Sequence, residues 1–172
     1  MFRHLTTDTY RVVPWANGRG QTTEMLRTEG AGGLVWRLSM AQVTEDGPFS
    51  VLPGLQRNLT VIAGPGFDLI GPGVRLRADP LVPVAFSGDL ALEASGVTGP
   101  SVDFNVMVAA RLPAPDVAVI DGVTDLAAGG LLLILALGQV QAGEAAMGRT
   151  DLVMTDQPLR VAGQAISVLI RR

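Results

Sequence analysis

Short apolar runs, separated by turn signals rich in Gly and Pro, follow one another along the whole chain. The 21 Gly and 11 Pro of the 172 residues are scattered among these runs instead of being gathered in one linker. Apolar runs of about four to eight residues bounded by such turns are typical of β-strands, and little in the sequence indicates a long amphipathic helix. The sequence therefore predicts an all-β protein, built as a sandwich or a barrel.

The strand signal recurs from the first third of the chain to its end. A helical turn near Gly143–Met147 is the one competing pattern. The expected strands are Val35–Ala41, Leu59–Ala63, Phe67–Ile70, Pro83–Phe86, Leu90–Ala94, Val102–Ala109, Val117–Ile120, Leu131–Leu137, Val153–Thr155 and Ala165–Ile170.

The longest apolar run is far shorter than the roughly 20 residues of a membrane-spanning helix. No basic segment precedes an apolar stretch at the N-terminus. We therefore expect a soluble cytoplasmic protein with no membrane partner.

The inventory of reactive side chains excludes many reaction classes. The chain has no Cys and one His, and all 13 of its basic residues are Arg. Thiol nucleophiles, Schiff-base lysines and P-loop lysines are therefore excluded, and a catalytic triad has only His4 as a base. The net charge of −3 and the scattered Arg residues give no basic patch, so we expect no nucleic-acid partner.

Two of the expected strands alternate between an apolar and a polar face. In one strand Arg37 and Ser39 share a face, and in the other Asp103 and Asn105 do, because successive side chains of a strand point to opposite sides. Two interpretations remain open. The polar face either meets solvent, as in many antiparallel sandwiches, or lines a polar ligand pocket inside a barrel.

Four distinctive motifs follow one another in the first two-thirds of the chain: "PWANGRGQTTE", "WRLSMAQVTEDGPFSVLPGLQRNLTVIAGPG", "PLVPVAFSGD" and "GPSVDFNVM". In sequence and in order they resemble the HutD/Ves family, small bacterial proteins associated with histidine utilisation or stress response. One departure stands in the opening motif, where Arg19 replaces a Gly that is common in the family.

The resemblance implies a cupin fold with two β-barrel modules, a bicupin of RmlC-like jelly rolls. We expect one compact unit whose halves, 1–111 and 112–172, are the two cupin modules. The resemblance also implies the binding of a small carboxylate such as urocanate, in a regulatory or metabolite-buffering role linked to histidine utilisation. The partner is then a small molecule, and the protein is a monomer or homodimer.

Many cupins bind a metal through His and Glu side chains, because neutral imidazole and carboxylate suit divalent transition metals. This chain offers His4 alone, and its carboxylates Glu24, Asp89 and Asp103 come from separate segments. We therefore expect no required metal and no cofactor. Asp89, in "FSGD", is more typical of a turn.

Arginine is the best candidate for ligand binding, because a guanidinium grips a carboxylate with two parallel hydrogen bonds. Each Arg could equally be a surface or ion-pair residue. Arg37 is favoured because it interrupts an apolar strand, and if buried it requires an anion, either Glu24, Asp103 or a ligand. Trp15 and Phe104 are more typical of a core. The ligand-binding candidates are Arg37, Asn17, Thr22, Glu24, Ser39, Arg57, Asp103 and Asn105; no catalytic residue is assigned.

Three functions from different classes stay open. The first is a metabolite-binding module, which needs Arg and neutral donors in a pocket. The second is a metal-independent enzyme, an isomerase or lyase, which uses Glu24 or Asp103 as a base and needs a carboxyl with a raised pKa. The third is a structural or protein-interaction role, which needs no pocket. In each case the Asn17-Gly18 pair is expected to form a hairpin turn that delivers Asn17, Thr22 and Glu24 to one end of the barrel.

Overall fold

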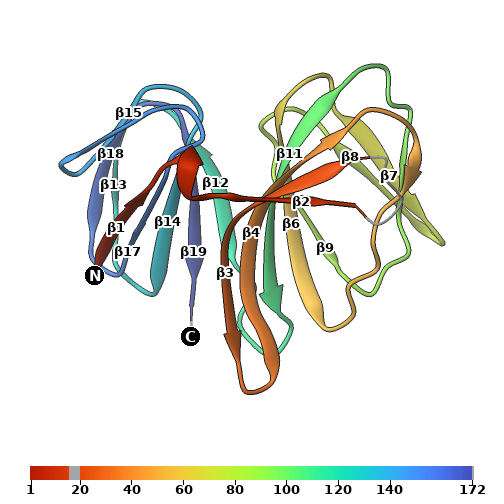
Figure 1. Cartoon of the computed structure of the whole chain (residues 1–172), viewed down its shortest axis with the longest axis horizontal. Helices are drawn as coiled ribbons and strands as arrows, with labels where there is room; N and C mark the ends of the chain where they lie inside the picture. Colours follow the sequence, from red (N-terminus) through yellow and green to blue (C-terminus); the bar gives the residue numbers. More distant parts are fainter. Residues whose placement is uncertain (16–19, 172) are drawn as a thin grey trace. The chain divides into compact units, whose positions relative to one another are not determined.

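A computed structural model describes residues 1–15 and 20–171 of the chain. It confirms the all-β class: among these residues the only helical segment is the 3₁₀ turn η1 (Thr7–Thr9). None of the helical structure in the described ranges is long or apolar enough to cross a membrane. The chain divides into two compact units, one of Tyr10–Arg111 and one of Met1–Thr9 with Leu112–Arg172. In Figure 1 the first runs from orange to green, and the second joins the red N-terminus to the blue strands.

The unit of Tyr10–Arg111 contains a six-stranded antiparallel sheet in the order β2-β3-β4-β11-β6-β9. Its centre is β11, which pairs with β4 on one side and β6 on the other. The strands of this sheet are β2 (Arg11–Pro14), β3 (Gln21–Gly30), β4 (Gly33–Val43), β6 (Leu55–Ala63), β9 (Val84–Ser87) and β11 (Ser101–Ala109).

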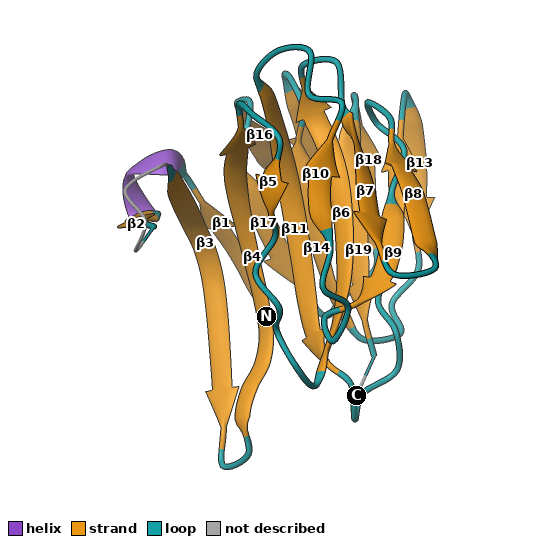
Figure 2. Cartoon of the chain, turned by 90° about the vertical axis from the view of Figure 1, so that its right-hand side faces the viewer, coloured by secondary structure: helices purple, strands orange, loops and turns teal. Residues whose placement is uncertain are grey.

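A second, four-stranded sheet completes this unit. It has the order β5-β10-β7-β8 and is formed by β5 (Gly47–Pro48), β7 (Phe67–Gly71), β8 (Val74–Ala78) and β10 (Glu93–Ser95). Figure 2 shows these strands as a layer in front of β6 and β11. Between the layers lies an apolar core of Val43, Leu59, Val61, Phe67, Leu69, Ala78, Leu92 and Ala94.

The unit of Met1–Thr9 and Leu112–Arg172 also has two sheets. One has the order β1-β17-β14-β19-β12, and the other the order β13-β18-β15-β16. Apolar side chains of both sheets, among them Ile134, Met147, Val153 and Val161, form its core. The strands are β1 (Phe2–Leu5), β12 (Asp116–Ile120), β13 (Val123–Leu126), β14 (Leu131–Ala136), β15 (Val140–Ala142), β16 (Ala145–Met147), β17 (Leu152–Thr155), β18 (Leu159–Ala162) and β19 (Ala165–Ile170).

The expected modules 1–111 and 112–172 differ from these units at the N-terminus. β1 pairs antiparallel with β17, with Phe2 opposite Thr155 and Leu5 opposite Leu152. The first nine residues therefore belong with 112–172. The competing helical turn at Gly143–Met147 is a strand, because Ala145–Met147 pairs with β15 in a tight hairpin.

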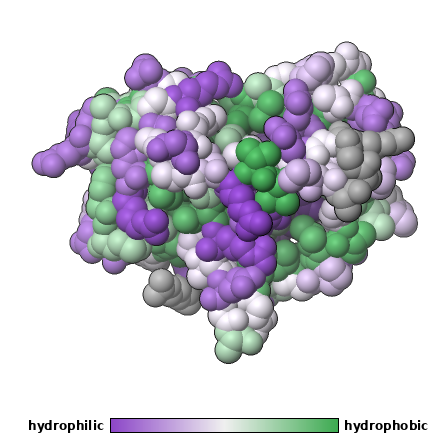
Figure 3. All heavy atoms as spheres, in the orientation of Figure 1, coloured by the Kyte–Doolittle hydropathy of each residue, from purple (hydrophilic) through white to green (hydrophobic). Residues whose placement is uncertain are grey.

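Large apolar side chains that stay exposed come from separate segments of the chain. They are Met1, Phe2, Val12, Val51, Val82 and Val123. Figure 3 shows hydrophilic and hydrophobic residues interspersed over the face that it presents. Isolated apolar residues on a surface are normal and indicate no partner by themselves.

Candidate functional site

A cavity of about 700 Å³ lies in the unit of Tyr10–Arg111. This volume falls within the roughly 300–1,000 Å³ of small-molecule sites. One wall is the six-stranded sheet, through residues of β2, β3, β4, β6 and β11. The opposite side is formed mainly by the segment 42–52, which includes Phe49 and Ser50.

The register of the sheet aligns the polar wall. Ser39 lies opposite Asn105, so these two side chains stand side by side. Met107 lies opposite Arg37 on one neighbouring strand and opposite Arg57 on the other. Since neighbouring strands are about 4.8 Å apart, the Cα atoms of the two Arg residues are about 10 Å apart across Met107.

The cavity decides between the two interpretations of the polar faces of β4 and β11. Arg37, Ser39, Asp103 and Asn105 all line the cavity. Ser39, Asp103 and Asn105 are buried, which excludes the interpretation that this face meets solvent. On the other face Trp36, Leu38, Phe104, Val106 and Val108 are buried as well, so the strand centres are covered on both sides and Phe104 is a core residue as expected.

Arg37 is held by Glu24, as the sequence predicts. The Nε of Arg37 donates to Glu24 Oε2 at 2.6 Å, and both side chains are largely buried. Glu24 lies on β3 and is absent from the cavity wall. The pairing fixes one edge of the guanidinium, and among the described residues its terminal nitrogens have no hydrogen-bond partner.

Arg57 is the buried cation of the wall, with only 6% of its surface exposed. Its guanidinium lies 5.0 Å from the centroid of the Phe86 ring and 5.7 Å from that of Phe49. Nη1 donates to the carbonyl oxygen of Ser50 at 3.2 Å and Nη2 to Oδ1 of Asn105 at 3.0 Å. These partners are all uncharged.

Within the described residues no carboxylate forms an ion pair with Arg57, and its Nε has no hydrogen-bond partner. Burial lowers the pKa of Arg57; the charge of Asp103 counteracts this shift and that of Arg37 adds to it. The site therefore holds two cations that repel each other, and of these two Arg37 alone contacts a carboxylate within residues 1–15 and 20–171.

Asn105 links Arg57 to Asp103. Its Oδ1 accepts from Arg57, and its Nδ2 donates to Oδ1 of Asp103. These two bonds fix the orientation of the amide. Oδ2 of Asp103 has no hydrogen-bond partner among the described residues, although Asp103 is fully buried and lines the cavity.

Burial raises the pKa of Asp103 to about 7, against the opposing effects of Arg57, Asn105 and the backbone of Ala41. A carboxyl titrating near neutral pH inside a cavity is typical of binding and catalytic sites. Asp103 can thus accept or donate a hydrogen bond depending on pH.

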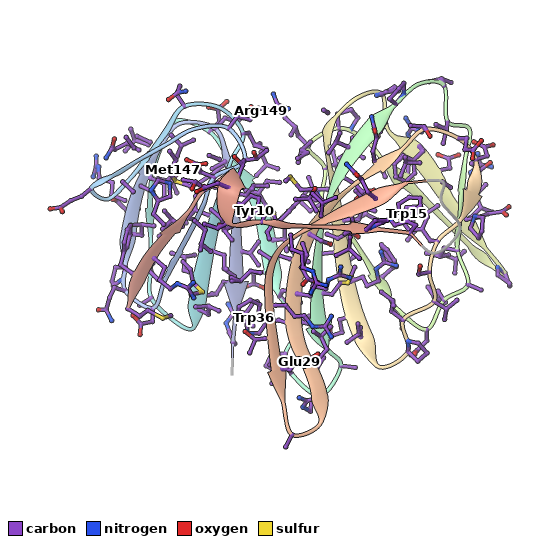
Figure 4. The ribbon with its side chains drawn as sticks, in the orientation of Figure 1. Tyr10, Trp15, Glu29, Trp36, Met147 and Arg149 are labelled. Carbon is purple, nitrogen blue, oxygen red and sulfur yellow. The ribbon has the colours of Figure 1, made fainter. Side chains whose placement is uncertain are left out.

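Trp15 and Thr22 form a further part of the wall. Nε1 of Trp15 donates to Oγ1 of Thr22 at 2.8 Å, and the Trp15 ring packs against Gly20. Figure 4 shows Trp15 near the end of β2. Trp15 is thus a cavity residue that is only partly buried, where the sequence favoured a core position. Asn17 and Gly18, the predicted turn, lie outside the described residues.

Acidic side chains also lie at the exposed part of the cavity. Asp46 accepts hydrogen bonds from the backbone N–H groups of Gly96 and Val97, and Glu45 follows β4 beside it. Asp46 is therefore committed to a loop, and the buried part of the wall carries the cations.

The residues present do not fit a cupin metal centre. The described ranges contain no group of three His, Asp or Glu side chains able to hold a metal ion. His4 lies in the other unit, where its Nε2 is 3.1 Å from Oδ2 of Asp151. Asp89 is a turn residue as expected, since it accepts from the backbone N–H of Gly54.

The sequence missed Phe49, Phe86, Ser50 and Met107 as parts of the site. Phe49 and Phe86 enclose Arg57 from segments 37 residues apart, and only the closed barrel brings them together. Met107 was identifiable, because it shares the alternating face of Asp103 and Asn105.

Comparisons with known proteins agree with this architecture. Residues 7–170 match the family model described as HutD. A relative from Pseudomonas putida, described as an uncharacterized 21.2 kDa protein in the hutC 3′ region, is 36% identical over 144 residues, which cover 80% of this chain and 75% of that protein. Protein Ves of Cronobacter sakazakii is 31% identical over 126 residues, which cover 71% of this chain and 70% of that protein.

Solved structures of related fold superpose on this chain along most of its length. The structure of HutD from Pseudomonas fluorescens SBW25 superposes with a TM-score of 0.92 at 30% identity, over 99% of this chain and 98% of that one. Protein Ylba from E. coli superposes with a TM-score of 0.73 at 12% identity, over 98% of this chain and 90% of that one, and shows the fold alone. The fold is that of the cupin proteins.

Proposed function

This chain belongs to the HutD family, and from that premise we propose that its cavity binds a small carboxylate such as urocanate. The observation that carries the proposal is Arg57, a buried cation in the cavity wall without a carboxylate in contact among the described residues. A buried charge is costly unless an opposite charge accompanies it. A bound anion would supply that charge.

Arg37 supports the same proposal from the other side of Met107. Glu24 occupies its Nε and leaves the terminal nitrogens for a ligand. An anion near both guanidinium groups also offsets the repulsion that contributes to the lowered pKa of Arg57. Carboxylates suit such groups because their two oxygens match the geometry of guanidinium N–H donors.

The rest of the cavity suits a flat organic ligand. Phe49 and Trp15 provide aromatic surfaces, and Met107 adds an adaptable apolar one. Ser39 and Thr22 supply hydroxyl groups on the same wall. The family's association with histidine utilisation makes urocanate the first acid to test, and binding without turnover would suit a regulatory or buffering role.

The experiment is calorimetric titration of the purified protein with urocanate at one fixed salt concentration. Arg37→Ala and Arg57→Met should each lower the affinity about 30-fold or more, because losing one partner of a buried charge pair costs about 2–5 kcal/mol. Methionine at position 57 keeps apolar contact with Phe49 and Phe86 while removing the charge.

Arg75→Ala is the matched control. Arg75 is in the same unit, its side chain is 73% exposed, and it pairs with Asp68 outside the cavity. Its loss should leave the affinity within about twofold, because exposed ion pairs contribute little. Thermal melting must show that each variant is folded. Unchanged affinity in both folded cavity variants would contradict the proposal.

A second candidate is a metal-independent isomerase or lyase. The raised pKa of Asp103 favours it, since a general base works best when its pKa is near the working pH. Nuclear magnetic resonance of urocanate incubated with the protein tests it. A new product that Asp103→Asn fails to form would support the enzyme, and an unchanged spectrum would contradict it.

A further inference from the structure

We propose that Asp103 is the specificity-determining residue of the cavity and selects carboxylates that carry an N–H donor away from the carboxylate. This inference rests on the proposed function and deepens it. It starts from Oδ2 of Asp103, a buried acceptor in the cavity wall that has no hydrogen-bond partner among the described residues.

The neighbours of Asp103 form a hydrogen bond with one of its two carboxyl oxygens. Oδ1 is taken by Nδ2 of Asn105, and Asn105 is itself held by Arg57. Asn105 therefore cannot turn to satisfy Oδ2 without breaking both bonds. Oδ2 has no hydrogen-bond partner among the described residues, and the only other group that acts on the carboxyl there is the backbone of Ala41. Because Asp103 lines the cavity, a ligand donor can reach this oxygen.

Charge decides which kind of partner fits. Burial raises the pKa of Asp103 to about 7 and Arg57 opposes that shift, so at pH 8 the carboxyl is ionised and only accepts hydrogen bonds, and the binding test below is made at that pH. The other charged groups of the site are Arg37 from β4, with Glu24 behind it, and Glu45 and Asp46 near the exposed part of the cavity. A ligand N–H can therefore donate the hydrogen bond that Oδ2 lacks. Arg37 and Arg57 attract the carboxylate of the same ligand molecule.

A pair of similar acids tests the selection. Urocanate carries an imidazole N–H, whereas 3-(2-furyl)acrylate has the same acrylate arm on a five-membered ring without any N–H. The wild-type protein should bind urocanate about tenfold more tightly or better, since a buried charged acceptor left without a donor weakens binding by at least that factor.

Asp103→Asn should abolish this preference. Asn105 still needs an acceptor, so the new amide turns its oxygen to Asn105 and presents its NH₂ group to the ligand. Affinity for urocanate should fall about tenfold, and affinity for furylacrylate should change less than threefold. Glu93→Gln, which removes an exposed carboxylate on β10 of the same unit, should change neither.

The outcomes are distinguishable. Equal affinity of wild-type protein for the two acids would overturn the role of Asp103, and this measurement does not depend on the folding of any variant. If the wild-type protein binds the two acids equally but Arg57→Met binds both more weakly, the proposed function stands although the role of Asp103 is wrong. If neither acid binds to the wild-type protein, both proposals fall.

Discussion

Arg57 and Asp103 are two buried charges that the fold places in one wall without direct contact. Asn105 lies between them and satisfies one nitrogen of the guanidinium and one oxygen of the carboxyl. The rings of Phe49 and Phe86 stabilise the cation through their negative faces, typically by about 1–2 kcal/mol when water is excluded. Nε of Arg57 and Oδ2 of Asp103 have no hydrogen-bond partner among the described residues.

The carboxyl of Asp103 makes stability fall with rising pH. Its pKa is about 7 in the folded protein, against 3.8 for the free side chain, so the folded state binds this proton more tightly than the unfolded state. Between pH 4 and pH 8 the folded protein should lose up to about 4 kcal/mol from this group. The loss is absent below pH 4 and complete above about pH 8.

Chemical denaturation at pH 4, 6 and 8 measures this effect. Asp103→Asn is the reference, because it removes the titrating group and keeps the shape of the side chain. The difference in free energy of unfolding between variant and wild type should grow in favour of the variant as the pH rises. A difference that is constant over this range would show that Asp103 does not titrate there.

Individual site residues could be predicted from the sequence where a charged residue interrupts an apolar strand. Arg37 was predicted as a site residue because it lies on an otherwise apolar strand, and its pairing with Glu24 is confirmed. The surroundings of Arg57 were not predictable in the same way. They come from segments that meet only when β6 pairs with β9 and the segment 42–52 closes over the sheet.

Among the elements, β3 and β4 form the long hairpin that carries Glu24 and Arg37, and Figure 2 shows it extending beyond its neighbours. β4 was predicted and runs two residues further at each end. β3 was missed, because "QTTEMLRTEG" is too polar and too irregular to give a strand signal. It forms a strand through its pairing with β2 and β4, so tertiary pairing overrides a weak local preference.

The turn between β6 and β7 depends on Gly66. Its φ is +78°, and a Cβ there would lie 2.1 Å from the carbonyl oxygen of Ala78. Gly66→Ala should therefore lower the free energy of unfolding by about 3 kcal/mol, through backbone strain and the clash together. The turn between β7 and β8 gives the control.

Gly73 has φ of +70° with open space around its Cβ position. Gly73→Ala should cost only the backbone strain, about 1 kcal/mol. Urea denaturation of both variants compares the two turns directly. Equal losses of stability would mean that the close approach of Ala78 contributes nothing.

At the scale of the whole molecule, two cupin-like units share one chain but differ inside. The unit of Tyr10–Arg111 has a cavity with Arg57, Asp103 and Asn105 in its wall beside its apolar core. The described interior of the other unit holds buried apolar side chains such as Leu132, Ile134 and Val161 from its two sheets. Composition and turn spacing predicted the all-β class, but the difference between the two interiors depends on side-chain packing.

We therefore expect one ligand per chain. Calorimetric titration with urocanate should give a stoichiometry near one, and it should stay near one in Asp125→Asn, which alters an exposed ion pair of the other unit. A stoichiometry near two would reveal a second site in residues 112–171.

The pairing of β1 with β17 has a consequence for the order of events during synthesis. Phe2–Leu5 is synthesised before its partner, Leu152–Thr155, which follows about 150 residues later. At about 5–20 residues per second, the first strand waits some 8–30 s for its place in the sheet. All strands of Tyr10–Arg111 are made during that interval, so Phe2–Leu5 can join its sheet only after the whole of the other unit has been synthesised.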